Sequence, residues 1–204
     1  MPKGAVQITK KAIANQQSPV ALDDYSDRPG DATWILSELI DEEVEKVLYA
    51  ALRDEFALEA LKSQNAQPGD LFSSKVGGIT GEQAGPAVQI DGEVLFFGPQ
   101  WGYDHVAAIG FGNDNVLIIT PTYEQIIRPE SLRFGPINPD DFDVFVVKSR
   151  VHFRRGFDET GYAKTIQVVD APGDWFGTIR INALEYEFGP IDQLYPFNTE
   201  TIDY

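Results

Sequence analysis

Short apolar runs alternate with amphipathic stretches along the first third of the chain. Residues 20–22 form a Val-Ala-Leu run that ends in an Asp-rich segment, and the apolar residues of 33–40 then recur at helical spacing. Residues 44–52 read as a second buried strand and residues 54–62 as a second helix. Asp31 stands where a short acceptor side chain would cap the first of these helices. A buried strand that breaks into a polar turn before a helix is typical of an α/β fold.

The rest of the chain changes to closely spaced strands. Segment 112–115, Gly-Asn-Asp-Asn, has the composition of a hairpin turn, and a short helix is expected around residues 129–134. The expected strands cover residues 71–76, 87–97, 106–111, 116–120, 142–147 and 165–169. We therefore predict one α/β domain over residues 19–204, preceded by a helical lead-in over residues 1–18. Its mixed sheet is β-rich in the second half of the chain, with helices packed on the sheet.

Charge narrows the range of partners. The 204 residues include 32 Asp and Glu against 16 Lys and Arg, a formal charge of −16. Neither nucleic acid nor an anionic membrane is an expected partner, because both attract clustered Lys and Arg. No apolar run approaches the roughly 20 residues of a membrane span, and no signal peptide is recognised near the N-terminus. We expect a cytoplasmic protein.

The scarcity of Cys and His limits the chemistry further. The sequence holds no Cys and two His, His105 and His152. A disulfide, a thiolate nucleophile and a Cys-ligated zinc are therefore excluded. A metal site built on these histidines would need carboxylates to complete it. We expect His105, which lies between Asp104 and an apolar strand, to be structural.

Polar residues crowd the end of the first expected strand. Asp23, Asp24 and Asp27 follow the apolar run directly. In open α/β sheets ligands usually bind beyond the carboxyl ends of strands, so these carboxylates are candidates for a site. The alternative is that they only form a turn, since Asp side chains readily bond nearby backbone N–H groups.

A basic stretch follows the strand expected at residues 142–147. Residues 148–155 hold four of the 16 Lys and Arg residues of the chain, and His152 lies among them. Such a cationic island in an acidic protein suits an anionic group such as a carboxylate, and His152 could move a proton near neutral pH. A structural ion-pair network with surrounding carboxylates is the alternative.

Four stretches together resemble the C-terminal domain of the microcystinase C (MlrC) family of metallopeptidase-like proteins. The most specific is Val-Lys-Ser-x-x-His-Phe-Arg at residues 147–154. The others are a strand with Asp-x-x-Asp and Gly-Asp-x-Thr at residues 19–33, a Gly-Gly turn and the next strand at 76–88, and closing segments at 169–173 and 194–196. The resemblance runs from about residue 5 to residue 197.

The resemblance implies a zinc-dependent peptidase or amidohydrolase, named for degradation of a cyclic peptide toxin, in which a larger N-terminal domain holds the zinc. That domain or subunit is then the expected partner, and this chain alone would carry no metal ligands and be inactive. The expected substrate is a small peptide or another carboxylate-bearing small molecule. The implied site residues are Asp24, Asp27 and His152 as catalytic candidates, and Lys148, Ser149, Arg150 and Arg154 as substrate-binding candidates.

The chain departs from the family pattern at three points. Arg28 replaces the usual Asn, the glycine-rich loop is reduced to Pro29 and Gly30, and Ile79 stands where Lys is common. A shortened loop removes backbone N–H groups that could hold an anion. Two other functions therefore stay open: a non-catalytic module that binds an anionic small molecule or partner subunit, and a structural relic whose acidity serves solubility. A homo-oligomer is also open, because an orphaned domain face would expose an apolar patch.

Overall fold

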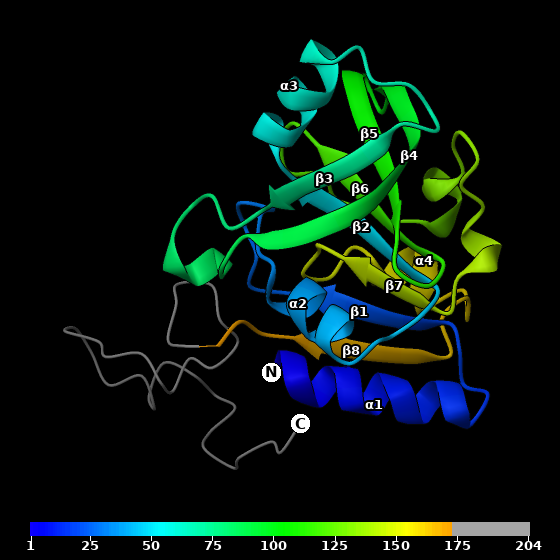
Figure 1. The fold of residues 1–204 in the computed structure, drawn as a ribbon. Helices are drawn as coiled ribbons and strands as arrows, with labels where there is room; N and C mark the ends of the chain where they lie inside the picture. The colour runs from blue at the N-terminus through cyan, green and yellow to red at the C-terminus, as the bar shows by residue number, and fades with distance from the viewer. Residues whose placement is uncertain (173–204) are drawn as a thin grey trace.

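The computed structural model of the protein describes residues 1–172. It consists of one mixed eight-stranded sheet in the order β3-β4-β5-β6-β2-β7-β1-β8, with helices packed on it (Figure 1). The prediction of a single α/β domain with a mixed sheet is confirmed. The closing segments expected at residue 173 and at residues 194–196 lie outside the described residues.

The parallel half of the sheet positions the polar residues of interest. It consists of β1 (Val20–Asp24), β2 (Val47–Arg53), β6 (Asn115–Thr120), β7 (Val144–Val147) and β8 (Thr165–Val169). β7 lies between β1 and β2 and pairs with both in parallel, while β8 forms the edge beside β1. Every residue of β1 and β7 is buried, which explains the apolar runs at residues 20–22 and 144–147.

The antiparallel half extends the sheet from β6. It consists of β3 (Leu71–Val76), β4 (Val88–Gln100) and β5 (Tyr103–Phe111). The long β4 and β5 form a hairpin, and a tight turn at residues 112–114 joins β5 to β6 as the Gly-Asn-Asp-Asn segment predicted.

Helices cover both faces, and strand alternation sorts the core into two clusters. α1 (Pro2–Ala14), α2 (Trp34–Asp41) and α3 (Glu55–Ser63) pack with Leu22 and Val146 on one face. The short helix α4 (Arg154–Phe157) packs with Ala21 and Val147 on the other. Three 3-10 turns complete the described elements: η1 (Glu82–Ala84), η2 (Pro129–Leu132) and η3 (Pro139–Asp141). None of the helices within residues 1–172 combines the length and apolar character needed to cross a membrane.

Three local predictions need correction. The strand expected from residue 44 begins at Val47, because Lys46 adopts a left-handed backbone conformation with φ of 54°. The helix expected over residues 129–134 is the 3-10 turn η2. Asp31 does not cap α2: the N-cap residue is Thr33, and the Asp31 carboxylate accepts hydrogen bonds from Thr80 instead.

Candidate functional site

The carboxyl ends of β1, β2 and β7 meet because the three strands are parallel neighbours. Asp23 and Asp24 end β1, while Lys148 and Ser149 follow β7 directly. Side chains on a strand alternate between the faces of a sheet. Asp24 therefore shares the face of Leu22, and Asp23 the opposite face. The structure thus brings the two polar clusters expected from the sequence together, but divides them between two sides of one sheet.

A fully buried ammonium organises the Asp24 face. Lys148 has no exposed surface, and its Nζ donates to Oδ2 of Asp24 at 3.0 Å, to Oδ2 of Asp27 and to the backbone oxygen of Ala32 at 3.1 Å. The Tyr49 hydroxyl lies 3.2 Å from the same nitrogen and donates to the Ala32 oxygen at 2.8 Å. All three ammonium hydrogens therefore have acceptors within the chain.

The charges of this cluster depend on one another. Burial acts to lower the pKa of Lys148, but attraction by Asp24 and Asp27 outweighs it and raises that pKa well above its usual value. Burial raises the pKa of Asp24 to about 6, although the Lys148 charge opposes the shift. The Lys148 ammonium therefore stays charged at neutral pH and offsets carboxylates that have left water.

Asp27 forms the turn between β1 and α2 as well as pairing with Lys148. Its Oδ1 accepts from the backbone N–H of Gly30 at 2.8 Å, and its Oδ2 from that of Ala32 at 2.9 Å. The Asp27 carboxylate thus forms the turn and also belongs to the candidate site, although the sequence analysis treated these two roles as alternatives. Its side chain is only 1% exposed.

The Gly-Gly turn is tied to the same loop. The backbone N–H of Gly77 donates to Oδ2 of Asp54, and that of Gly78 to the backbone oxygen of Asp31. Gly77 has φ of 68°, and a Cβ there would lie 2.5 Å from the Thr33 side chain. Only glycine fits this close approach, so the turn fixes the start of α2.

Asp23 lies on the opposite face without a comparable partner. It is fully buried, and neither carboxyl oxygen forms a hydrogen bond of good geometry among the described residues. Burial raises the pKa of Asp23 to about 8 and the charge of Asp24 adds to the shift, while the nearby Ser149 backbone N–H and the Arg154 charge oppose it. Asp23 is therefore largely protonated at neutral pH, which avoids burying a carboxylate that has no counter-ion.

A short polar chain leads from Ser149 to the surface. The Gln125 amide donates to Oγ of Ser149 at 2.9 Å, and its Oε1 lies 3.2 Å from Nδ1 of His152. In this arrangement the amide orients the exposed imidazole and leaves its Nε2 directed away from the contact. Ser149 Oγ also accepts from the backbone N–H of Phe153, just before α4.

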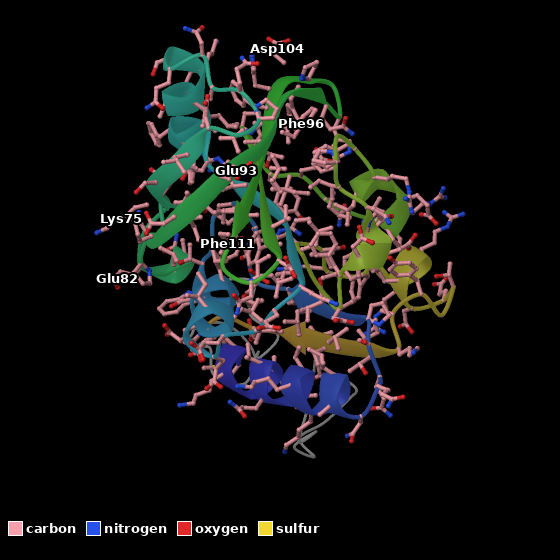
Figure 2. The ribbon with its side chains drawn as sticks, turned by 45° about the vertical axis from the view of Figure 1, so that its right-hand side comes forward. Lys75, Glu82, Glu93, Phe96, Asp104 and Phe111 are labelled. Carbon is pink, nitrogen blue, oxygen red and sulfur yellow. The ribbon has the colours of Figure 1, made fainter. Side chains whose placement is uncertain are left out.

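Both arginines of the signature lie over aromatic rings. The Arg150 guanidinium stacks 4.9 Å from the centre of the Tyr25 ring. Arg154 pairs with Asp158 at 2.6 Å and lies over the Phe153 ring. His105 is placed elsewhere, on the β4–β5 hairpin whose tip carries Asp104 (Figure 2), and stacks 4.8 Å from Phe97.

A small pocket of about 290 Å³ opens beside the Asp27 turn. Its lining includes Asp27 and exposed Arg28 from the turn after β1, and Thr80 and Gln83 from the segment after β3 that contains η1. Arg28, one of the departures from the family pattern, thus supplies a cation to the lining of this pocket.

Sequence reasoning missed Tyr49 and Gln125. Tyr49 is the one polar-tipped residue of the buried Val47–Leu52 stretch of β2, and that contrast could have marked it. Gln125 carried no local signal, because its contacts to Ser149 and His152 span 24 and 27 positions.

The described residues do not fit the zinc implied by the resemblance. Within residues 1–172, no three His, Asp or Glu side chains are grouped as metal ligands. Oδ2 of Asp24 and Oδ2 of Asp27 both pair with the Lys148 ammonium, and Asp23 faces the other side of the sheet. This donor set suits an ammonium rather than a metal ion.

Comparison with known proteins agrees with this fold. Residues 28–179 match the family model described as the MlrC C-terminus. No curated protein matches the sequence. The crystal structure of a protein from Mesorhizobium sp. BNC1, named "Putative metallopeptidase", is similar with a TM-score of 0.58 at 14% identity over 81% of this chain. The chain covers only 35% of that protein.

Proposed function

Because the chain belongs to the MlrC C-terminal family, we propose that it is the C-terminal unit of a metallopeptidase-like hydrolase and supplies polar groups for substrate binding. The metal, zinc in this proposal, is held by a separate N-terminal domain or subunit. The observation that carries the proposal is the convergence of the family signature, residues 147–154, with the Asp24–Asp27 turn at the carboxyl edge of the sheet.

Within this proposal the buried residues hold the loops of the site in place, and the exposed residues bind the substrate. Lys148, Asp24 and Asp27 hold the loops of the edge, since their charged atoms are enclosed within the chain. His152, oriented by Gln125, is exposed and able to accept or donate a proton at Nε2. Arg154 offers a guanidinium that a substrate carboxylate could take over from Asp158.

The binding test uses the full chain and N-acetylalanine, a small carboxylate that carries an amide bond. We expect His152→Ala and Arg154→Ala to weaken its binding by at least about tenfold in calorimetric titration. Arg133→Ala is the matched control, because Arg133 is also exposed and pairs with an aspartate, Asp140, outside this edge. It should bind like the parent.

Circular dichroism separates binding from folding. If His152→Ala and Arg154→Ala fold normally and lose binding, the assigned roles hold. If both unfold, the signature is structural, and if all three variants bind alike, the edge does not recognise carboxylates. Stoichiometric zinc in the purified chain, lost in His152→Ala, would overturn the separate location of the metal.

A further inference from the structure

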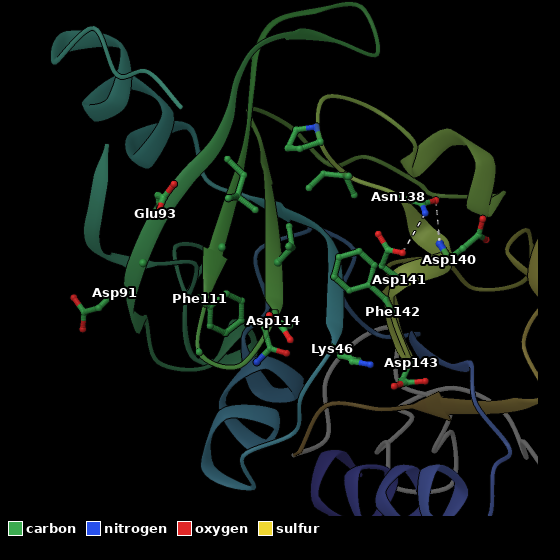
Figure 3. Close-up of a pocket in the computed structure, with 18 of the residues that line it drawn as sticks. Lys46, Asp91, Glu93, Phe111, Asp114, Asn138, Asp140, Asp141, Phe142 and Asp143 are labelled. Carbon is green, nitrogen blue, oxygen red and sulfur yellow. Dashed lines mark hydrogen bonds between the residues drawn. The ribbon is translucent and has the colours of Figure 1, made fainter. Parts of the chain in front are cut away.

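A second cavity lies at the other end of the parallel strands. It is a groove of about 1130 Å³ between the face of β4 and β5 and the segment that leads into β7, residues 136–143 (Figure 3). Lys46, which precedes β2, and Asn115, which begins β6, also line it. The groove is therefore at the amino ends of these strands, opposite the edge that carries Lys148.

The floor of the groove is partly apolar. Leu71 is 88% exposed, the highest value among the large apolar side chains of residues 1–172, and it pairs with Glu93 across β3 and β4. Half-buried Leu95, which packs with the core cluster of Ala21 and Val147, continues this floor. Gly110 lets the Leu95 side chain lie close against β5, because a Cβ at that position would lie 3.1 Å from it. An exposed apolar surface inside a cavity of this size is typical of an interaction site.

Carboxylates surround this floor. Six of the lining residues are acidic and one, Lys46, is basic. Among the described residues only Asp140 of the six has an ion pair, with Arg133 at 2.8 Å. The acidic residues are Asp91, Glu93, Asp114, Asp140, Asp141 and Asp143. Hydrogen bonds from Ser73 and Gln89 lower the pKa of Asp91, so this carboxylate is charged at neutral pH.

The volume of the groove and the charge of its lining together indicate what kind of molecule would bind there. A volume of about 1130 Å³ exceeds what most drug-sized ligands fill and leaves room for several residues of a chain. A second copy, with a formal charge of −16, would be repelled. Residues 173–204 are equally unsuited, because they hold six acidic residues and one Arg. A complementary partner must be cationic and must also offer apolar surface.

We propose that this groove docks a basic segment of another protein, with Lys or Arg side chains against the carboxylates and at least one large apolar side chain on the Leu71 floor. The proposal is independent of the function proposed for the carboxyl edge, because the two sites share no residue. Complementary charge would speed the association, and burial of the apolar floor would slow dissociation.

The test uses a fluorescein-labelled peptide of alternating Lys and Leu. We expect fluorescence anisotropy to show binding to the full chain that weakens as salt rises. Two comparison peptides dissect the recognition. Alternating Glu and Leu should not bind, and alternating Lys and Ser should bind about tenfold more weakly, because it lacks apolar side chains.

Charge-reversal variants locate the site. Glu93→Lys combined with Asp143→Lys should weaken the binding of the Lys-Leu peptide by about tenfold or more. Glu59→Lys combined with Glu130→Lys is the matched control: it changes the net charge equally, from exposed positions outside the groove lining. Leu71→Ser should reduce affinity for the Lys-Leu peptide while leaving the Lys-Ser peptide unchanged.

Three results would overturn the proposal. They are no binding of the Lys-Leu peptide at low salt, equal losses in the groove and control variants, and equal affinity for the Lys-Leu and Glu-Leu peptides. Equal losses would show that only net charge attracts the peptide. Circular dichroism of each variant confirms that affinity rather than folding has changed.

Discussion

The two ends of the parallel strands differ in whether their charged side chains form ion pairs within the chain. At the carboxyl ends, Lys148 is completely buried and pairs with Asp24 and Asp27 inside the chain. At the amino ends, Lys46 and most carboxylates of the groove form no ion pair among the described residues. A buried charge must find its partner within the fold, whereas an exposed charge is available to partners from outside. Substitutions at the carboxyl ends should therefore mainly change the free energy of unfolding, and substitutions at the amino ends should mainly change binding to partners.

The largest effect is expected from Lys148→Met. This change leaves Asp24 and Asp27 buried without their cation, and removal of one member of a buried ion pair typically costs about 3–5 kcal/mol. Urea denaturation at neutral pH, followed by circular dichroism, measures the loss. Adding Asp27→Asn to Lys148→Met should recover part of it, because one uncompensated charge is then removed.

Lys46→Met supplies the matched control at the groove. The same substitution there should change the free energy of unfolding by no more than about 0.5 kcal/mol, as for most surface positions. Similar losses for the two methionine variants would contradict the contrast between the two ends.

The next effect concerns the carboxyl edge itself, where Asp23 has no counter-ion. Its folded pKa is raised to about 8 from an ordinary value of 3.8, so the folded state holds a proton that the unfolded state loses. Stability should fall as pH rises from about 4 to about 8, by several kcal/mol, and then level off. Asp23→Asn cannot ionise there, so its profile should be shallower, with only the smaller fall that Asp24, whose pKa is raised to about 6, contributes.

Urea denaturation of the parent and Asp23→Asn at pH 5, 7 and 8.5 measures this difference. The variant should be the more stable of the two at the highest pH. Parallel profiles would mean that Asp23 ionises normally and that water or another group satisfies it.

Periodicity explains why much of the fold was predictable. The buried strands appear as apolar runs because both of their faces are covered. The strand expected at residues 165–169 matches β8, although this edge strand is only half-buried before its last residue. The position of Asp24 and Lys148 after apolar strands marked both as site candidates, because ligands usually bind beyond the carboxyl ends of strands. Their direct pairing could not be predicted, since 124 positions separate them and strand order decides the contact.

Contacts with residues distant in the sequence explain what the sequence analysis predicted wrongly or missed. A local cap was expected for Asp31, but Thr80 offers its hydroxyl and its backbone N–H, and these satisfy the carboxylate better than a helix start would. Asp23 and Asp24 have the same chemistry and adjacent positions, yet one is paired and one is not. The alternation of β1 separates them, and only the packing of β7 shows which face holds the cation.

A smaller effect is expected from Tyr49→Phe. The Tyr49 hydroxyl donates to the Ala32 oxygen, but Lys148 donates to the same oxygen and would keep it satisfied. The loss should therefore be about 1 kcal/mol, the net value of one hydrogen bond. Tyr103→Phe, which removes a more exposed hydroxyl that contacts Glu124, is the control and should lose less in the same urea titration.

The smallest effect should come from neutralising the groove. Glu93→Gln with Asp143→Asn removes two carboxylates that form no ion pair within residues 1–172, and it relieves repulsion in a strongly acidic protein. The free energy of unfolding should rise by no more than about 0.5 kcal/mol, and the gain should shrink as salt screens the repulsion. Thermal denaturation at low and high salt measures both. A loss of more than about 1 kcal/mol would show that these carboxylates hold the fold together, as Asp24 and Asp27 do at the other end, and would remove the distinction between the two ends.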